Sequence, residues 1–493
     1  MIKRRLTGNL NLDKNWKREV RNGKQYAGEC LKIFRLPIFP FRFPLGLLSN
    51  LRRVVSCFLA LGAILSWQSC QPGPKEKAAT ARPNIVLIMA DDLGYGGIGC
   101  YGNQVLQTPH LDQLAAEGLR FTDFHSNGAV CSPTRAALLT GRYQQRAGLE
   151  GVIYVKGPTR QIGLDSSEQT MAKLLKANGY ATGIFGKWHL GYAPAFNPVH
   201  HGFDEFYGYL SGNVDYHSHY DNAGIYDWWH NLDSIQEEGY STDLITTHAV
   251  DFIKAHQDEP FFVYVPHESP HVPFQGRNDP GFRFPDNEFT YQGPVTDTDR
   301  AYIEMVEVMD EGIGVILQTL KDLHLEENTL VLFISDNGAE AFGHNGALNG
   351  DKGHLLEGGH RVPAIAYWKG KIQAGVSDET IMSFDWLPTF LALSNSSKPT
   401  DVALDGIDLS PLLLHGQALP PRNLYWRYRK ESAIRQNQYK LWVKGADTLL
   451  FDLQQDLAES QNIAAQHPTL VQELAKALHT WESEMNKVTQ KAD

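Results

Sequence analysis

Apolar runs alternate with amphipathic stretches along most of the chain. Four uninterrupted apolar runs predict strands buried on both faces: 83–89, 181–185, 260–265 and 330–335. Helical spacing and capping residues predict helices between and beside these strands: 109–118, 132–142, 168–178, 242–256 and 297–323. This alternation is typical of a mostly parallel sheet with helices on both faces.

The pattern changes from about residue 395 onwards. Short β-prone runs separated by turn residues are followed by one amphipathic helix: 423–428, 432–436, 439–444, 448–453 and then 468–485. We therefore predict an α/β protein with a large, mostly parallel sheet sandwiched by helices, plus a small C-terminal antiparallel sheet with one helix.

The first 70 residues have a different composition from the rest. Arg52 and Arg53 precede the apolar run 54–67, which ends close to Cys70. A basic segment, a short apolar run and a small residue before a cysteine predict an export signal, with Cys70 as the candidate lipid-attachment site. Trp67 and Gln68 are unusual just before a lipidated cysteine. We expect an exported bacterial protein, in the periplasm or as a cell-surface lipoprotein.

These patterns divide the chain into four parts. Residues 1–70 form a basic extension and export signal that is removed, and residues 71–81 form a linker rich in proline and charge. Residues 82–395 form the main, catalytic domain, and residues 396–486 form a C-terminal α+β subdomain.

Net charge narrows the classes of partner. The whole chain carries a formal charge of −11, and because residues 1–69 carry +10, the remainder carries −21. Because these residues are strongly acidic, we do not expect the protein to bind nucleic acid. An anionic substrate must then be captured by a local basic pocket.

Cysteine usage points to one residue. Of the five cysteines, only Cys100 and Cys131 lie beyond the export segment, so the mature protein has at most one disulfide. Cys131 begins a predicted helix with Pro133 in its first turn, where backbone N–H groups favour an anion. Arg135 lies one turn further on. A capped helix with an incidental cysteine is the alternative interpretation.

Polar residues follow two of the predicted strands directly. Asp91 and Asp92 come after the strand 83–89, and Asp336 and Asn337 come after the strand 330–335. The carboxyl ends of strands in an open α/β sheet are where sites form. Three carboxylates and one carboxamide make an oxygen-rich site for Ca²⁺ or Mg²⁺.

The segment Cys131-Ser-Pro-Thr-Arg135, followed by Thr140-Gly-Arg142, resembles the signature of the formylglycine-dependent (type I) sulfatases. Thr134 stands where the commonest form of the signature has serine. The resemblance covers residues 82–485 and is strongest to bacterial carbohydrate sulfatases and N-acetylgalactosamine-6-sulfatase-like arylsulfatases. It implies an alkaline-phosphatase-like fold, and it implies that a separate maturation enzyme oxidises Cys131 to Cα-formylglycine.

The resemblance also implies the site residues. The metal, Ca²⁺ with Mg²⁺ as the alternative, would be bound by Asp91, Asp92, Asp336, Asn337 and the modified Cys131. The remaining catalytic residues also lie in family-like elements. Arg135 belongs to the cysteine motif itself. Three further elements contribute the others: Lys187 and His189 of Gly186-Lys-Trp-His, His271 of Ser269-Pro-His-Val-Pro, and Lys352 of Asp351-Lys-Gly. The element Glu357–Pro363 is also family-like, and we interpret it as mostly architectural.

The implied activity is that of a sulfuric ester hydrolase. The hydrated aldehyde at position 131 attacks sulfur while Lys187, Lys352 and the metal neutralise the sulfate oxygens. We expect His271, assisted by Lys352, to protonate the leaving oxygen and His189 to remove the remaining hydroxyl proton. The alternatives are a phosphonate monoester or phosphodiester hydrolase of the same superfamily, and a non-catalytic carbohydrate-binding protein.

The substrate is expected to be a sulfated saccharide. The galactose or N-acetylgalactosamine type is favoured, with exo-acting removal of sulfate from units of a polysaccharide. The polar and aromatic segment 213–220 offers Asp215, His217 and His219 as candidate sugar contacts. A packed polar loop explains the same residues equally well.

Overall fold

Strand β1 (Asn84–Ala90) is buried along all seven of its residues, as a strand in the middle of a covered sheet must be. Over the described residues it belongs to a ten-stranded sheet, whose other strands in chain order are β2 (Leu119–Phe121), β4 (Ala181–Lys187), β5 (Glu205–Tyr209), β6 (Trp229–His230), β7 (Asp233–Ser234), β8 (Phe261–Pro266), β9 (Thr329–Ser335), β10 (Ala364–Tyr367) and β11 (Gly375–Ser377). The spatial order is β11-β2-β10-β9-β1-β8-β4-β5-β6-β7.

The centre of this sheet is parallel. The neighbours β9, β1, β8, β4 and β5 all run in the same direction. Antiparallel pairing is confined to the positions where β10 lies between β9 and β2 and where β6 and β7 extend the opposite edge. The predicted large, mostly parallel sheet is confirmed.

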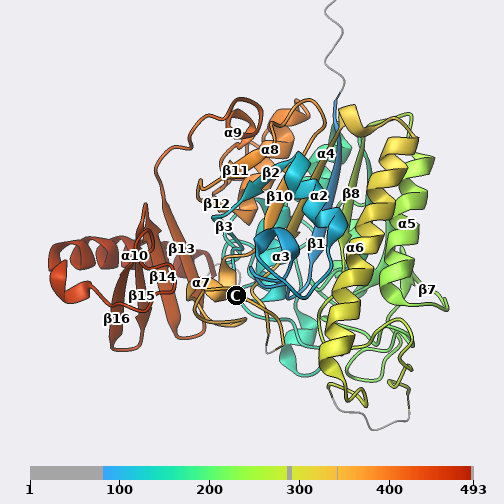
Figure 1. The fold of residues 1–493 in the computed structure, drawn as a ribbon, viewed down its shortest axis with the longest axis horizontal. Coiled ribbons are helices and arrows are strands. Elements are labelled where there is room, and N and C mark those ends of the chain that lie inside the picture. The colour runs from blue at the N-terminus through green and yellow to red at the C-terminus, as the bar shows by residue number, and fades with distance from the viewer. Residues whose placement is uncertain (1–81, 286–290, 341, 490–493) are drawn as a thin grey trace, which may run out of the picture. The chain divides into compact units, whose positions relative to one another are not determined.

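One face of the sheet is covered by three helices (Figure 1). Side chains at alternate positions of β1, among them Ile85 and Leu87, enter a core with α3 (Cys131–Thr140), α4 (Met171–Ala177) and α8 (Trp386–Leu393). Alternation follows from the strand period of two, which sends successive side chains to opposite faces.

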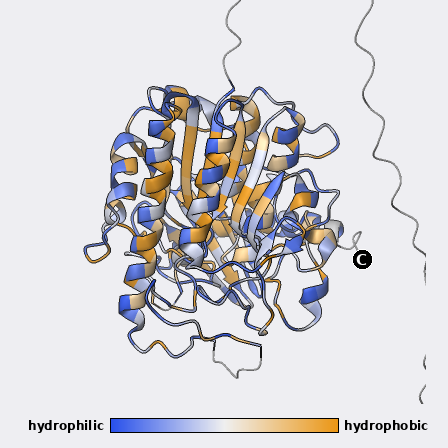
Figure 2. Cartoon of the chain, turned by 90° about the vertical axis from the view of Figure 1, so that its right-hand side faces the viewer, coloured by the Kyte–Doolittle hydropathy of each residue, from blue (hydrophilic) through white to orange (hydrophobic). Residues whose placement is uncertain are grey.

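The other face is covered by α2 (Pro109–Glu117), α5 (Ser241–Ala255) and α6 (Thr298–Asp322). The remaining side chains of β1, such as Val86 and Ile88, pack against them. Figure 2 shows helices with one apolar and one polar side around largely apolar strands, which is the pattern expected when helices cover a sheet.

The C-terminal part is a sequential antiparallel sheet. Its strands β13 (Asn423–Tyr428), β14 (Glu431–Gln436), β15 (Tyr439–Lys444) and β16 (Asp447–Asp452) pair in chain order, and α10 (Pro468–Thr489) covers it. The four strands and the helix agree with the sequence-based prediction. Their shared core also takes in side chains of the main body: Ala129, Val130, Tyr143, Leu355, Met382 and Phe384.

The predicted helices are confirmed, with small shifts at their ends. Helix α10 ends at Thr489, four residues beyond its expected end at residue 485. Helix α4 was expected to begin at residue 168. It begins after Thr170, because the Thr170 side chain accepts a hydrogen bond from the Lys173 backbone N–H and so caps the helix there. Besides short 3₁₀ helices, the elements that the sequence pattern did not predict are β2, β3 (Phe124–His125), β5, β6, β7, β10, β11, β12 (Ile381–Met382), α7 (Glu357–His360), α8 and α9 (Ser410–His415).

This computed structural model describes residues 82–285, 291–340 and 342–489, and these residues belong to one unit, Ala78–Asp493. The export signal, Cys70 and the linker predicted from the sequence lie outside the described residues. Among the helices that are described, none combines the length and apolar character needed to cross a bilayer.

Candidate active site

Four adjacent parallel strands deliver polar side chains to one edge of the sheet. Asp91 follows β1, Asp336 follows β9, Lys187 is the last residue of β4, and His271 lies on the loop after β8. The spatial order β9-β1-β8-β4 makes these strands neighbours. Their carboxyl ends therefore bring together residues that are far apart in the sequence, as is general for open α/β sheets.

Helix α3 places Cys131 at this edge. Cys131 is the first residue of the helix, only 2% of it is exposed, and its Sγ lies 3.5 Å from Asp91 Oδ1. One turn further on, the buried guanidinium of Arg135 donates to Asp336 Oδ2 at 2.7 and 3.1 Å and to the Lys187 carbonyl at 3.2 Å. Arg135 therefore lies behind the carboxylates and ties α3 to β9 and β4.

The carboxylates at the strand ends repel one another. Burial, followed by the nearby charge of Asp336, raises the pKa of Asp91 well above its ordinary value. Burial opposes ionisation of Asp336 as well, but Arg135 and Lys187 hold the pKa of that carboxyl below its ordinary value. Lys187 Nζ lies 2.6 Å from Asp91 Oδ2. Such crowding of buried carboxylates is relieved when a cation binds among them.

A divalent cation fits this group. Ligand atoms of four buried residues lie within 4.8 Å of one another: Asp91, Asp92, Cys131 and His271. Asn337 Oδ1 is buried and has no hydrogen-bond partner among the described residues, although its Nδ2 donates to Asp92 Oδ1 at 2.7 Å. An amide oxygen without a donor beside a set of carboxylates is what an oxygen-binding cation would satisfy.

The predicted metal residues differ from this tight group in two respects. His271 belongs to it, although the sequence suggested only a catalytic role for this residue. Asp336 is held just outside it, because its Oδ1 accepts from the Asp92 backbone N–H at 3.2 Å and its Oδ2 accepts from Arg135.

Lys352 enters the site from the loop after β9. Its Nζ lies 2.6 Å from Asp92 Oδ2, 3.3 Å from His271 Nε2 and 3.8 Å from Glu340 Oε2. His271 Nδ1 lies 2.6 Å from the Val272 carbonyl oxygen. Because a carbonyl only accepts, Nδ1 of the neutral ring carries the proton and Nε2 accepts from Lys352. Burial and the charges of Lys352 and Lys187 lower the pKa of His271 well below its ordinary value.

His189 has a different proton arrangement. Its Nε2 donates to the Ile153 carbonyl at 2.9 Å, and its buried Nδ1 has no hydrogen-bond partner among the described residues. Burial, followed by the charge of Lys187, keeps the pKa of His189 well below its ordinary value. The neutral ring therefore presents a lone pair at Nδ1. Gly212 leaves room for this ring, because a Cβ there would lie 2.9 Å from His189 Cε1.

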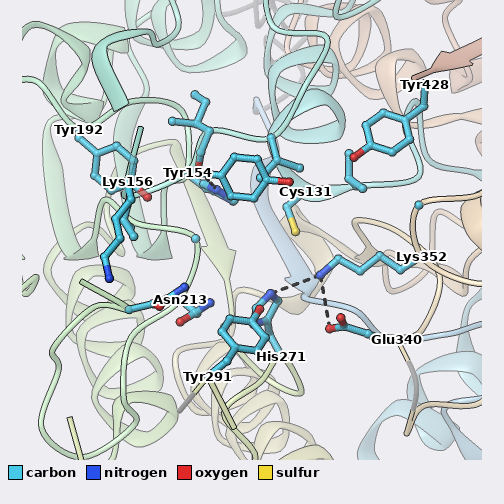
Figure 3. Close-up of a pocket in the computed structure, with 18 of the residues that line it drawn as sticks. Cys131, Tyr154, Lys156, Tyr192, Asn213, His271, Tyr291, Glu340, Lys352 and Tyr428 are labelled. Atoms are coloured by element: carbon cyan, nitrogen blue, oxygen red, sulfur yellow. Dashed lines mark hydrogen bonds and ion pairs between the residues drawn. The ribbon is translucent and has the colours of Figure 1, made fainter. Parts of the chain in front are cut away.

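A cavity of about 510 Å³ opens above these residues, and Figure 3 shows Cys131, His271 and Lys352 at its base. Cavities of this size accept small ligands. Side chains from several loops complete the walls: Tyr154, Lys156, Tyr192, Asn213, Asn222, Tyr291, Glu340, Tyr428 and Arg429.

The three predicted sugar contacts do not line this cavity. Asp215 is fully buried, and its carboxylate accepts hydrogen bonds from the backbone N–H groups of four residues: His217, Ser218, Phe282 and Arg283. His217 Nε2 donates to the Gly276 carbonyl at 3.0 Å, and His219 Nε2 donates to the Gly239 carbonyl at 3.2 Å. These contacts favour the packed-loop interpretation, and only Asn213 of the segment 213–220 reaches the cavity wall.

Most residues of the cavity wall were not predicted from the sequence. Tyr154 and Lys156 come from the loop after α3, Tyr192 from the loop after β4, and Tyr428 and Arg429 from the C-terminal sheet. Exposed aromatic and basic residues are common in loops, so these positions carry no local signal of a site.

A second buried cluster confirms the architectural interpretation of the segment that begins at Glu357. His125 Nδ1 and His360 Nδ1 lie 3.0 Å apart, and Glu357 is beside them. Two basic side chains of the protein already contact this cluster. Lys440 Nζ lies 2.9 Å from Glu357 Oε1, and Arg435 Nη1 lies 3.0 Å from His125 Nε2. The cluster joins the main body to the C-terminal sheet.

Comparisons with known proteins agree with this geometry. The family model described as "Sulfatase" matches residues 83–396, and the model described as "N-sulphoglucosamine sulphohydrolase, C-terminal" matches residues 348–488. Among solved structures, Ps i-CgsB in complex with k-i-k-neocarrahexaose gives a TM-score of 0.73 at 31% identity, covering 81% of this chain and 92% of that chain. A phosphonate monoester hydrolase of Agrobacterium radiobacter shares the fold, with a TM-score of 0.59 at 20% identity over 82% of this chain and 96% of that chain.

Curated relatives agree as well. Arylsulfatase A of Homo sapiens is 38% identical over 435 residues, which cover 81% of this chain and 82% of the relative. N-acetylgalactosamine-6-sulfatase of Homo sapiens is 36% identical over 397 residues, which cover 75% of this chain and 73% of the relative. The chain therefore belongs to the sulfatase family and is a sulfuric ester hydrolase.

Proposed function

We propose that this enzyme removes sulfate from saccharide units of the galactose or N-acetylgalactosamine type, acting on the ends of a sulfated polysaccharide. One observation carries the proposal. Cys131 begins a helix at the base of a pocket, and the buried Lys187 and the pocket-lining Lys352 each face a carboxylate of the candidate metal group. An anion and a cation can therefore bind side by side at position 131.

The metal is proposed to be Ca²⁺, with Mg²⁺ as the alternative. Asp91, Asp92 and Asn337 supply oxygen atoms, which hard cations prefer, and Asn337 Oδ1 is the atom without a donor. With hydrated formylglycine at position 131, the metal would lower the pKa of one hydroxyl of the hydrate and neutralise negative charge on the sulfate. The proposed partner for maturation is a formylglycine-generating enzyme acting on Cys131.

The two lysines are proposed to bind the sulfate oxygens. Lys187 is fully buried, whereas Lys352 reaches the cavity, where 15% of its side chain is exposed. Their ammonium groups would lie on the metal side of the sulfate and favour the charge that develops on its oxygens in the transition state. Arg135 supports them from behind through Asp336.

The histidines are proposed to move protons. His271 Nε2 accepts a hydrogen bond from Lys352 Nζ at 3.3 Å, so the neutral ring needs a proton from Lys352 before it can protonate the leaving oxygen. This supports a pair in which Lys352 supplies the proton and His271 delivers it. His189 offers the lone pair of its buried Nδ1 and would accept the hydroxyl proton at position 131.

The substrate class is inferred from relatives and from the shape of the site. Human N-acetylgalactosamine-6-sulfatase is named for an amino sugar, and Ps i-CgsB was solved with k-i-k-neocarrahexaose. The cavity of about 510 Å³ suits one or two sugar units rather than a long chain. Tyr154 and Tyr192 offer aromatic faces for sugar rings.

The cellular location is also part of the proposal. The composition of residues 1–70 supports export, with a lipid anchor at Cys70 on the cell surface or release into the periplasm of a bacterium. N-terminal sequencing of the mature protein tests this proposal, and the presence of residues 1–40 in that protein contradicts it.

The experiment for the proposed reaction uses protein made in a host with formylglycine-generating activity. Sulfate release is measured from 6-O- and 4-O-sulfated galactose and N-acetylgalactosamine and from an aryl sulfate, and hydrolysis of an aryl phosphodiester is measured beside them. Faster turnover of a sulfated sugar supports the proposal. Preference for the phosphodiester contradicts it, and sulfate release from the aryl sulfate alone contradicts the saccharide assignment.

A further inference from the structure

Two basic side chains line the cavity without an acidic partner. Lys156 and Arg429 are exposed at its walls, and neither forms an ion pair with a carboxylate of the described chain. The two lysines at the base differ, because Lys187 and Lys352 are paired with Asp91 and Asp92. In a chain with a formal charge of −11, unpaired cations at one pocket create a local attraction for anions.

The backbone that precedes Lys156 is attached to the helix that begins at Cys131. The neighbouring Ile153 receives a hydrogen bond at its carbonyl from His189 Nε2 at 2.9 Å, and its N–H donates to Ser132 Oγ at 3.2 Å. The loop is closed further on, where the Tyr154 N–H donates to Thr159 Oγ1 at 3.0 Å. Lys156 thus extends from a loop that is attached to α3 beside Cys131, and Figure 3 shows it on the side of the cavity away from Lys352.

Arg429 is held by the C-terminal sheet. It lies in the turn between β13 and β14, where its φ of 53° is left-handed, and its guanidinium lies 5.1 Å from the centre of the Tyr428 ring. Contact with the Tyr428 side chain limits the freedom of the guanidinium, whose five N–H donors exceed what one tyrosine can accept. The end of the same turn is attached to the Lys352 segment, because Glu431 Oε2 accepts from the Leu355 N–H at 2.9 Å.

We propose that Lys156 and Arg429 form a cationic rim in which each cation can bind an anionic group of the substrate other than the sulfate that is released. Such a group is a sulfate ester or a carboxylate on the same oligosaccharide, since both are oxygen anions that lysine and arginine bind. This inference rests on the proposed saccharide sulfatase function. It narrows the substrate to oligosaccharides that carry more than one anionic group.

The test compares three disaccharides that share the same scissile sulfate. The first has no other charge, the second carries a further sulfate on the neighbouring sugar, and the third carries a uronate carboxylate there. Initial rates are measured for the aldehyde-containing enzyme and for the double variant Lys156→Ala/Arg429→Ala. Lys430→Ala is the matched control, because Lys430 is exposed in the same turn but does not line the cavity.

The double variant is expected to lose about tenfold in kcat/KM on at least one doubly charged substrate, mainly through KM. Its kcat/KM on the singly charged disaccharide should stay within about twofold of the wild type. The loss in kcat/KM is compared between the second and third substrates, and the larger loss shows whether sulfate or carboxylate is the group that the rim binds. Equal losses on all three substrates, or no loss on any, overturn the proposal.

A binding measurement tests the cationic rim independently of sulfate hydrolysis. Titration calorimetry of the same disaccharides against Cys131→Ala protein needs no turnover, and the rim variants are made in that background. Weaker binding of a doubly charged disaccharide, caused by loss of the rim alone, supports the rim. If the wild type releases no sulfate from any sugar, the proposed function fails. If the affinity for the doubly charged disaccharides does not depend on Lys156 and Arg429, the cationic rim is contradicted whether or not the enzyme releases sulfate.

Discussion

Lys187 Nζ lies 2.6 Å from Asp91 Oδ2, and both side chains are fully buried. The pair joins the last residue of β4 to the first residue after β1, across the intervening strand β8. In this pair a proposed sulfate-binding cation neutralises a candidate metal ligand. The anion site and the cation site therefore depend on each other electrostatically.

Replacing Lys187 by methionine is expected to abolish measurable sulfate release and to destabilise the metal-free protein. The variant removes the nearer of the two cations beside buried Asp91 and leaves only Arg135, at 3.4 Å from Asp91 Oδ1. Removal of one partner from a buried pair costs about 3–5 kcal/mol. Added Ca²⁺ should restore part of this stability, because it neutralises the same carboxylates. Urea unfolding with and without Ca²⁺ measures both effects.

The control for this variant is Lys176→Met. Lys176 also lies close to a carboxylate, at 2.5 Å from Asp204, but their side chains are 47% and 40% exposed. An exposed pair contributes little, so this variant should unfold within about 1 kcal/mol of the wild type. An equally small loss for Lys187→Met would contradict the electrostatic role given to the buried pair.

Calcium binding should be detectable without any activity assay. We expect Ca²⁺ to raise the thermal midpoint of the wild type, since it binds the folded state through Asp92 and Asn337. Asp92→Asn and Asn337→Ala should remove most of that increase. Asp351→Asn, at an exposed carboxylate near Lys352, serves as the control. A calcium-induced shift that survives both site variants would place the metal elsewhere.

Acid stability should depend on His201, which is remote from the proposed chemistry. Burial lowers its pKa to about 3, and neither ring nitrogen has a hydrogen-bond partner among the described residues. Between that value and the ordinary value of 6.5, the unfolded chain binds a proton that the native protein does not. Stability must therefore fall as the pH is lowered through this range, by up to ~1.4 kcal/mol per pH unit for this residue.

His201→Asn removes this contribution. Urea unfolding at several pH values between 6.5 and 4.5 should show a shallower slope for the variant than for the wild type. His479→Asn, at an exposed position of α10, should leave the slope unchanged. Parallel curves for His201→Asn and the wild type would show that His201 is not kept neutral by burial.

We expect the C-terminal sheet to keep the segment that contains Lys352 in position, because Lys440 of β15 pairs with Glu357, which follows that segment in the chain. Lys440 Nζ lies 2.9 Å from Glu357 Oε1 and 2.8 Å from Glu459 Oε1, and all three side chains are buried. Lys440→Met leaves two buried carboxylates facing each other, so we expect a loss of about 3–5 kcal/mol. At a temperature where the variant stays folded, a raised KM for sulfated sugar indicates that the Lys352 segment has shifted. An unchanged stability would contradict this role.

The base of the site was predictable from the sequence because local signals mark it. Asp91 and Asp336 directly follow apolar runs that can only be buried strands, and Cys131 begins a helix whose residues form a specific motif. Parallel strands bring such positions to one edge whatever lies between them. His271 is close enough to the carboxylates to join the metal group, and this depends on the path of the loop after β8, which the sequence pattern does not fix.

The walls of the site were not predictable for a physical reason. Arg429 reaches the cavity only because the C-terminal sheet packs against the main body, and no local pattern encodes that docking. Asp215 and His219 have the residue types of sugar contacts, but their polar atoms bond to backbone groups of their own and of neighbouring segments. Composition shows which groups can form hydrogen bonds and leaves open which partners they find.

Modified Cys131 is proposed to be the nucleophile that hydrolyses sulfate esters of saccharides. The most direct test is sulfate release from 6-O-sulfated N-acetylgalactosamine and galactose by protein in which mass spectrometry has verified the aldehyde at position 131. We predict release in proportion to the aldehyde content and none from Cys131→Ala protein. Aldehyde-containing protein that releases no sulfate from any sugar, or a cysteine left unmodified in a host that matures other sulfatases, would contradict the claim.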